Sequence, residues 1–155
     1  MTYKFKVMTQ EQAEKIAFHW HYDGEYSFYD MEADKEDLDD FLNPETRGNS
    51  MFAVTKDEEL VAFFSVNEVV DTTYDIGLGM RPNLTGGGKG LEFLKTAMDF
   101  VISTYEPEKI TLSVATFNKR AIKLYRKIGF KDMHTFIQAT NGSTYEFLKM
   151  VYECY

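Results

Sequence analysis

Six residues from Thr85 to Gly90, Thr-Gly-Gly-Gly-Lys-Gly, have the composition of an anion-binding loop. Glycine lets backbone N–H groups come close to a phosphate, because no side chain stands in the way. A strand-like run, 74–80, precedes the loop, and a run with apolar residues at helical spacing, 91–102, follows it. The start of a helix adds unpaired N–H donors and the positive end of its dipole. A plain turn is the alternative, although a turn seldom needs four glycines. The candidate anion-binding residues are Thr85, Gly86, Gly87, Gly88, Lys89 and Gly90.

Two familiar phosphate loops do not fit these residues. The nucleoside-triphosphate loop places Ser or Thr after its Gly-Lys pair, whereas Gly90 follows Lys89 here. This disfavours an enzyme that uses ATP or GTP. The dinucleotide fingerprint, Gly-x-Gly-x-x-Gly, belongs to the first strand of a βαβ unit. In this chain the third glycine comes one residue early and the loop lies in the middle of the sequence.

A second segment, 118–130, reads Asn-Lys-Arg-Ala-Ile-Lys-Leu-Tyr-Arg-Lys-Ile-Gly-Phe. It follows the pattern Asn-x-x-Ala-x-x-x-Tyr-x-x-x-Gly-Phe of the GNAT superfamily of N-acetyltransferases without a departure. The glycine loop fits the cofactor pattern of that superfamily, Gln/Arg-x-x-Gly-x-Gly/Ala, except that Thr85 stands at the first position. With both motifs in order and a strand between them, the chain resembles GNAT N-acetyltransferases over about residues 50–155.

The resemblance implies acetyl-CoA as the cosubstrate and assigns roles to several residues. The glycine loop would hold the pyrophosphate, and Asn118 would hydrogen-bond the pantetheine arm or the thiol region. Backbone groups of Leu78, Gly79 and Met80 would contact the pantetheine arm and the thioester. Tyr125 would be the general acid that protonates the departing thiolate.

The general base is less well defined by the sequence. Asp75 lies on the strand that enters the glycine loop, and Glu68 lies near the end of the preceding strand. Either carboxylate can instead face solvent, since strands expose alternate residues, and a water chain could replace both. No metal site is expected, because His19 and His21 flank one residue and would face apart.

An aromatic and acidic segment, 19–30, precedes these motifs. In the superfamily this part of the chain forms some of the acceptor pocket, and aromatic residues are common in ligand sites. Aromatic residues are equally ordinary core material, so both interpretations stay open. The candidate acceptor-binding residues are Trp20, Tyr22, Tyr26 and Tyr29.

Composition narrows the class of protein. With 155 residues, 44% of them apolar, the chain is expected to form one domain over 1–155 with a substantial core. A formal charge of −8, from 17 basic and 25 acidic residues, argues against nucleic-acid binding. The single cysteine excludes an internal disulfide. No run approaches membrane-spanning length and no secretory signal is visible, so no membrane contact and a cytoplasmic location are expected.

The expected elements are strands at 3–8, 51–55, 60–69, 74–80, 109–115, 130–139 and 144–152, with helices at about 9–20, 34–42, 91–102 and 118–128. Asn141-Gly142 is a strong hairpin signal, and right-handed crossover logic makes strands 74–80 and 109–115 parallel. This order predicts an α/β protein of α+β type with the GNAT fold: a mostly antiparallel sheet of about seven strands, flanked by helices and splayed at one parallel pair.

The sequence therefore predicts an acetyl-CoA-dependent N-acetyltransferase that acts on a primary amine of a small molecule or a peptide. A degenerate acyl-CoA-binding sensor without catalysis is the alternative, because Thr85 replaces Gln or Arg. The identity of the acceptor stays open, and a homodimer stays possible.

Overall fold

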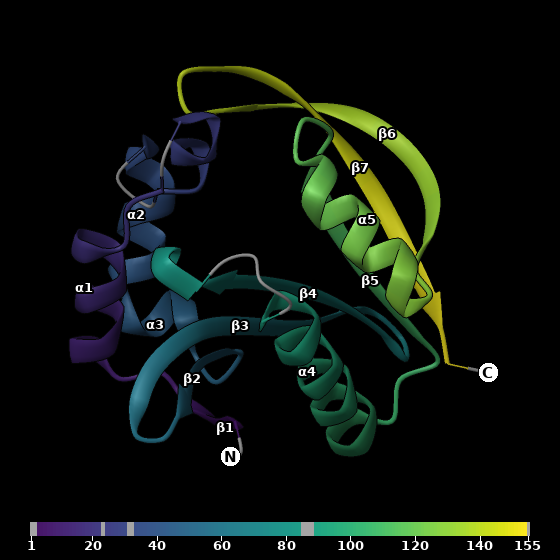
Figure 1. Ribbon diagram of the computed structural model, residues 1–155, viewed down its shortest axis with the longest axis horizontal. Helices are drawn as coiled ribbons and strands as arrows, with labels where there is room; N and C mark the ends of the chain where they lie inside the picture. Colours follow the sequence, from purple (N-terminus) through teal and green to yellow (C-terminus); the bar gives the residue numbers. More distant parts are fainter. Residues whose placement is uncertain (1–2, 23, 31–32, 85–88, 155) are drawn as a thin grey trace.

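The computed structural model describes residues 3–22, 24–30, 33–84 and 89–154. Seven strands form one sheet in the order β1-β2-β3-β4-β5-β7-β6 (Figure 1). Neighbouring strands are antiparallel except β4 and β5, which are parallel. The predicted mixed sheet with one parallel pair is therefore confirmed. The strands are β1 Tyr3–Val7, β2 Met51–Lys56, β3 Glu59–Val70, β4 Thr73–Met80, β5 Lys109–Ala115, β6 Lys131–Thr140 and β7 Ser143–Glu153.

Helices join these strands where the sequence signals place them. A capping box opens the first helix: the Thr9 hydroxyl accepts the Gln12 N–H at 3.2 Å, and the Gln12 side chain accepts the Thr9 N–H at 3.0 Å. No helix in the described part of the chain is long and apolar enough to cross a membrane. The helices are α1 Gln10–His19, α2 Lys35–Leu42, α3 Pro44–Arg47, α4 Lys89–Tyr105 and α5 Lys119–Ile128, with 3₁₀ turns η1 Gly24–Tyr29 and η3 Pro82–Leu84.

Two local features were not expected from the sequence. The helix α2 ends at Leu42, as expected, but Pro44 then starts the short helix α3, because the Asn43 side chain accepts the N–H groups of Glu45 and Thr46. Proline suits the first position of a helix, where its missing N–H costs nothing. Residues 24–29, for which no regular element was expected, form the 3₁₀ turn η1.

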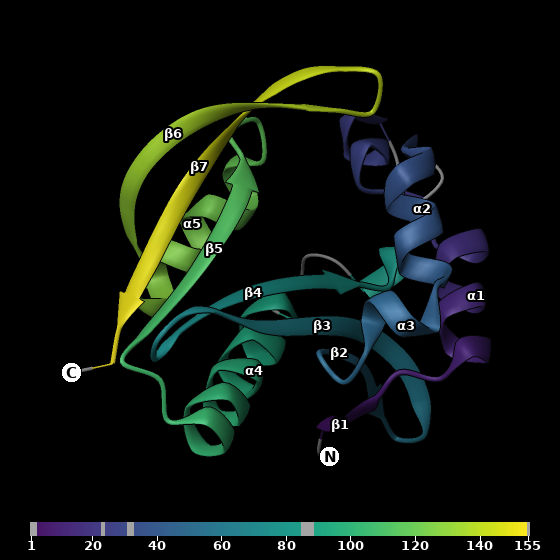
Figure 2. The same cartoon turned by 180° about the vertical axis from the view of Figure 1, so that it is seen from behind.

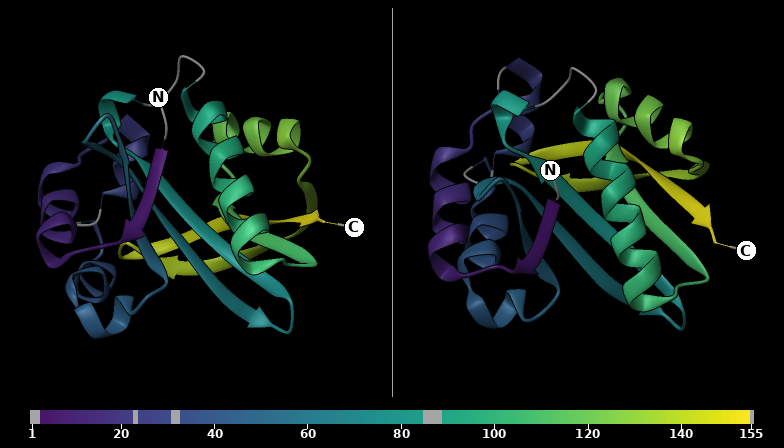
Figure 3. Two further views of the ribbon diagram at one scale, coloured as in Figure 1. Left: turned by 90° about the horizontal axis from the view of Figure 1, so that it is seen from below. Right: turned by 60° about the horizontal axis from the view of Figure 1, so that its bottom comes forward.

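The helices cover both faces of the sheet (Figure 3). Alternate residues of β2 divide between two cores, since successive side chains of a strand point to opposite faces. Phe52 and Val54 pack with α4 and α5 residues such as Phe93 and Ile122. Ala53 packs instead with residues of α1 and α2. The pair α4 and α5 therefore covers one face, and the pair α1 and α2 covers the other.

The hairpin of β6 and β7 arches from the C-terminal side of the molecule to the segment before α2 (Figures 1 and 2). Asn141 and Gly142 at its tip both have positive φ, 52° and 77°, as the predicted two-residue turn requires. The Asn141 N–H donates to the Asp34 carboxylate at 2.7 Å. The hairpin tip and the segment before α2 thus meet across the open end of the splayed strands.

Candidate active site

The parallel strands β4 and β5 stay paired over three residues only. The pairing joins 73–75 to 109–111, and beyond it the two strands diverge (Figures 1 and 2). The Arg81 N–H donates to the Val61 carbonyl of β3 at 2.9 Å, so odd-numbered residues of β4 direct their backbone groups toward β3. Leu78 and Met80 consequently direct theirs into the gap on the β5 side. We call this exposed backbone the β4 edge.

Gly77 and Gly79 are required by the neighbouring strand. A Cβ atom on Gly77 would lie 2.7 Å from the Ser65 hydroxyl oxygen, and one on Gly79 would lie 2.4 Å from the ring of Phe63. Both are closer than real Cβ contacts. Side chains from β3 thus fill the space above these glycines, and Gly79 directs its own backbone groups to β3 rather than into the gap.

The opposite side of the gap is formed by α5 and its N-cap residue, which carry two of the predicted site residues. Asn118 caps the helix, with its side-chain oxygen accepting the Ala121 N–H at 3.2 Å. Tyr125 lies two turns further along and packs against Phe130, with ring centroids 5.9 Å apart. Burial raises the pKa of the Tyr125 hydroxyl, and the nearby Tyr29 raises that pKa further. The hydroxyl is therefore a protonated donor at physiological pH.

Residues 22 and 24–29, which we call the bridging segment, contact both sides of the gap. The Tyr22 hydroxyl donates to the Met80 carbonyl at 2.6 Å, and the Asn118 side-chain amide donates to the Tyr29 hydroxyl at 3.0 Å. Burial is the main cause that raises the pKa of Tyr22, and the carboxylate of Asp30 adds to it. Asp30 also accepts the Tyr22 N–H at 2.7 Å, which fixes the start of the segment.

The four predicted acceptor-binding residues lie in different surroundings. Tyr22 and Tyr29 bind the two sides of the gap, as described. Tyr26 of η1 packs against the start of α5: the Arg120 guanidinium lies 4.7 Å from the centroid of the Tyr26 ring. Trp20 is only 5% exposed and packs in the core beneath α1, 6.2 Å from the ring of Phe63. Its indole ring is core material, the second of the two interpretations left open by the sequence.

Both candidate base residues already have partners. The Asp75 carboxylate accepts the Thr111 hydroxyl at 2.7 Å and pairs with the Lys149 ammonium at 3.2 Å. Asp75 stands where β4 and β5 are still paired, at the closed end of the gap. Glu68 is exposed and accepts the Thr72 N–H at 3.1 Å, in the turn between β3 and β4. Neither carboxylate lies at the open end beside Asn118.

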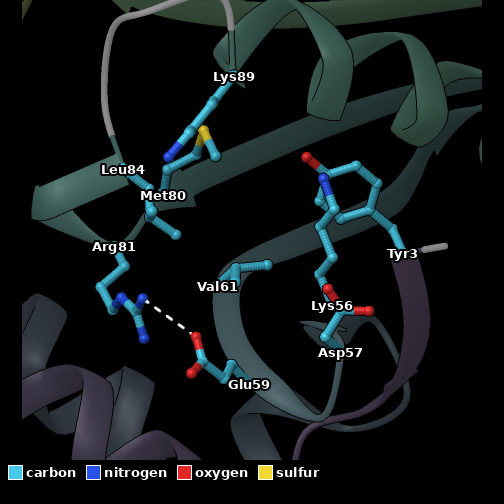
Figure 4. Close-up of a pocket in the computed structure, with 9 residues that line it drawn as sticks. All are labelled: Tyr3, Lys56, Asp57, Glu59, Val61, Met80, Arg81, Leu84 and Lys89. Carbon is cyan, nitrogen blue, oxygen red and sulfur yellow. Dashed lines mark ion pairs between the residues drawn. The ribbon is translucent and has the colours of Figure 1, made fainter. Parts of the chain in front are cut away.

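The glycine loop connects the β4 edge to α4. Thr85, Gly86, Gly87 and Gly88 lie outside the described residues. Lys89 begins α4 and lines a cavity of about 260 Å³ on the side of β1, β2 and β3 (Figure 4). A Cβ atom on Gly90 would lie 3.4 Å from the Leu124 side chain, so this glycine lets α4 and α5 approach closely.

Two of the positively charged residues that line this cavity form ion pairs with carboxylates. Arg81 and Glu59 pair at 3.6 Å, as the dashed line in Figure 4 marks, and Lys56 pairs with Glu92 at 2.8 Å. Within the described ranges, no group of three or more His, Cys, Asp or Glu side chains could hold a metal ion.

Aromatic residues of the C-terminal half were not singled out from the sequence, although they adjoin the site. The ring of Phe28 packs against Phe117 at 5.4 Å, Tyr145 at 4.7 Å and Phe147 at 6.1 Å. The one available signal was the alternation of Tyr145 and Phe147 on the last strand, which places both on the same face. Nothing in the sequence linked that face to residue 28.

Comparison with known proteins gives a consistent result. The model of the acetyltransferase (GNAT) family matches residues 14–130. No curated protein matches the sequence. Solved structures of low sequence identity share the fold. A spermidine N-acetyltransferase chimera of Vibrio cholerae SpeG and hSSAT has a TM-score of 0.74 at 17% identity, covering 99% of this chain and 96% of its own.

Two further structures extend this likeness. A GNAT-family acetyltransferase from Bacillus anthracis has a TM-score of 0.74 at 15% identity, covering 99% of this chain and 95% of its own. Ribosomal-protein-S5-alanine acetyltransferase from Vibrio fischeri has a TM-score of 0.66 at 14% identity, covering 99% and 93%. At these identities the likeness establishes the fold, a seven-stranded mixed sheet splayed at one parallel pair.

Proposed function

The chain belongs to the GNAT acetyltransferase family, and we propose that it transfers the acetyl group of acetyl-CoA to a primary amine by direct attack. The observation that carries this proposal is the gathering of Tyr125, Asn118 and Tyr29 across the gap from the β4 edge. Asn118 and Tyr29 are hydrogen-bonded to each other, and Tyr29 is close enough to Tyr125 to affect its pKa.

The β4 edge fits an extended acyl-pantetheine arm. Leu78 and Met80 direct backbone groups into the gap where β5 no longer pairs with β4. The Met80 carbonyl accepts the Tyr22 hydroxyl. The other backbone N–H and C=O groups of this edge need partners, and an amide-bearing arm laid along the strand would supply them. An N–H donor aimed at the thioester oxygen would also stabilise the negative charge that develops there during attack.

Tyr125 supplies the proton that the leaving group needs. As the nitrogen of the neutral amine bonds to the carbonyl carbon, the carbon–sulfur bond breaks and the electron pair stays on sulfur. The Tyr125 hydroxyl, whose pKa is raised by burial, is the proposed donor to this thiolate. Asn118 and Tyr29, hydrogen-bonded to each other, place polar groups at the open end of the gap.

Of the two candidate bases, Asp75 fits the role better than Glu68. Asp75 lies on β4 itself, and its contacts with Thr111 and Lys149 hold the carboxylate in place at the closed end of the gap. A chain of water molecules from the amine at the open end to this carboxylate would complete the path. Glu68 is exposed and held in the β3–β4 turn. Loss of activity in Asp75→Asn but not in Glu68→Gln would support this choice, and the reverse result would contradict it.

Calorimetry with acetyl-CoA, together with a thiol-release assay over a library of amines, tests the whole proposal. We expect binding and turnover on at least one small amine, a class represented among the structural neighbours by spermidine N-acetyltransferases. Binding without turnover on any amine would favour a sensor of acyl-CoA, the alternative that Thr85 keeps open. Absence of binding would contradict both functions.

A variant in the glycine loop tests the cofactor assignment separately. Gly88→Val adds a branched side chain where the backbone is proposed to meet the pyrophosphate, and should weaken acetyl-CoA binding severely. Circular dichroism and thermal unfolding serve as controls for the fold. Wild-type affinity in this variant would remove the loop from the cofactor site.

A further inference from the structure

An open pocket of about 590 Å³ lies between the bridging segment and the hairpin tip. Pockets of this size are typical of small-molecule sites. We call it the aromatic pocket. Its lining residues are Ser27, Phe28, Ala33, Phe117, Asn141 and Tyr145.

We propose that the aromatic pocket receives an apolar or aromatic group carried by the amine acceptor, and that it sets the acceptor preference. This inference rests on the proposed acetyl transfer, whose amine it describes more closely. The argument starts from the position of the pocket. Phe28 and Phe117 line it, and the next residue of each, Tyr29 and Asn118, form the 3.0 Å hydrogen bond of the site. The pocket therefore adjoins the place where the amine must react.

The chemistry of the lining favours an uncharged group. None of the described lining residues is charged. Asp34, whose carboxylate accepts the N–H of the lining residue Asn141 at 2.7 Å and the Asp37 N–H at 3.1 Å, does not itself line the pocket. An ammonium group entering this pocket would give up hydration without gaining a carboxylate partner, which is costly. A ring or branched alkyl group loses nothing of the kind.

Neighbouring contacts disfavour a second cation as well. Aromatic rings can attract a cation through their faces, but the Arg120 guanidinium already occupies the face of Tyr26 beside the pocket. The rings of Phe28 and Phe117 meet edge to face, at an interplanar angle of 87°. The geometry therefore points to a monoamine with an apolar substituent rather than to a polyamine.

Three amines separate these possibilities in an acetyl-transfer assay. Ethylamine and 2-phenylethylamine share the same ammonium group and arm and differ by the ring, whereas spermidine adds charges. We expect kcat/KM for 2-phenylethylamine to exceed that for ethylamine by roughly 10–100-fold, the discrimination that an apolar pocket commonly gives. Equal values for these two amines, or a preference for spermidine, would overturn the inference.

A pocket-filling variant locates the preference. Ser27 is exposed and lines the pocket, so Ser27→Phe should fill part of it without disturbing the core. The ratio of kcat/KM for 2-phenylethylamine to kcat/KM for ethylamine should fall by about tenfold in this variant. Ser103→Phe, at an exposed serine of α4, is the matched control and should keep the advantage. An undiminished advantage in Ser27→Phe would place the ring elsewhere.

Ligand-observed NMR makes the test independent of turnover. Saturation transfer to the phenyl protons of 2-phenylethylamine should be strong with the wild type and with Ser103→Phe, and weak with Ser27→Phe. If no amine is acetylated but this pattern holds, the proposed function fails while the pocket is upheld. If saturation transfer is absent, or equal in all three proteins, the pocket assignment fails whatever the turnover.

Discussion

The two sides of the candidate site are built in different ways. On the α5 side, Asn118 caps its own helix through a contact three residues away, and Tyr125 follows two turns later on the same helix. In the bridging segment, Tyr22 reaches a partner 58 residues away and Tyr29 reaches one 89 residues away. One side is local in sequence, and the other depends on the complete tertiary structure.

This difference separates two kinds of function. The local side holds Asn118 and Tyr125, whose proposed roles toward the cofactor and the leaving thiolate would be the same for every amine. The distant side supplies aromatic side chains that meet residues of the last hairpin, where the acceptor is proposed to bind. Changes on the local side should therefore alter the rate with every amine, while changes in the bridging segment should alter which amine is used.

The largest expected effect belongs to the local side. Tyr125→Phe removes one hydroxyl and keeps the ring, so acetyl-CoA affinity and packing against Phe130 should hold. Turnover should fall by about 10²-fold or more, in kcat and kcat/KM together, as for an interaction made only in the transition state. Tyr105→Phe, a tyrosine of α4 that packs against Tyr74, is the control. Unchanged turnover in Tyr125→Phe, with chemistry limiting the rate, would remove this residue from the mechanism.

The β4 edge can be tested through stability. Gly79→Ala would place a Cβ atom 2.4 Å from the Phe63 ring, and such overpacking typically costs about 1–3 kcal/mol of unfolding free energy. Urea denaturation measures this loss. Phe63→Leu should partly restore stability in the double variant, because the smaller side chain leaves room. Equal losses with and without Phe63→Leu would show that the clash is not the reason for glycine here.

A smaller effect is expected in the bridging segment. Tyr29→Phe removes the acceptor of the Asn118 amide, and loss of one such hydrogen bond costs about 1 kcal/mol, roughly a fivefold change in kcat/KM. Tyr26→Phe keeps the ring beneath Arg120 and should change little. If the bridging segment selects the amine and the local side does not, the loss of kcat/KM in Tyr29→Phe should differ between amines, whereas the loss in Tyr125→Phe should be the same for all of them. Identical losses across amines would contradict a role for Tyr29 in acceptor selection.

The smallest expected effect is a change in pH dependence at the hairpin tip. Hydrogen bonds from the N–H groups of Asn141 and Asp37 lower the pKa of Asp34 below its ordinary value of 3.8. A lowered folded-state pKa gives stability that is present above 3.8 and is lost as the pH falls through the folded value. Asp34→Asn keeps an acceptor for the α2 cap but removes the charge.

Urea midpoints of both proteins, measured from about pH 7 to about pH 3, test this sign. The advantage of the wild type over Asp34→Asn should be constant in the upper part of this range and should shrink as the pH approaches the lower end. Other carboxylates with lowered pKa, such as Asp132, are common to both proteins and cancel in the comparison. If the stability advantage of the wild type over Asp34→Asn instead grows as the pH falls, the proposed lowering of the Asp34 pKa is wrong.

The parts of the structure that could be predicted from the sequence are those that depend on patterns of residues close together in the chain. The helix expected at about 118–128 is found at Lys119–Ile128, and the Asn141-Gly142 turn is found where expected; both depend on residues close to one another in the sequence. The parallel pair of β4 and β5 followed from crossover handedness. These features fixed the fold and the local side of the site.

What could not be predicted depends on contacts across long stretches of chain. Lys149 reaches Asp75 over 74 residues, so no local pattern shows that the candidate base carries an ion pair. Trp20 and Tyr22 are two residues apart, yet one is a core residue and the other binds the Met80 carbonyl. Only the path of the backbone after α1 decides this, and aromatic composition alone does not specify that path.

The docking of the hairpin on the bridging segment has a consequence for synthesis of the chain. Asn141 is made 107 residues after its partner Asp34, and at ordinary translation rates of about 5–20 residues per second this is a delay of about 5–20 s. Throughout that interval Phe28 has neither Tyr145 nor Phe147 to pack against. The aromatic stretch therefore emerges well before the aromatic pocket can close, and this pocket is among the last parts of the molecule to form.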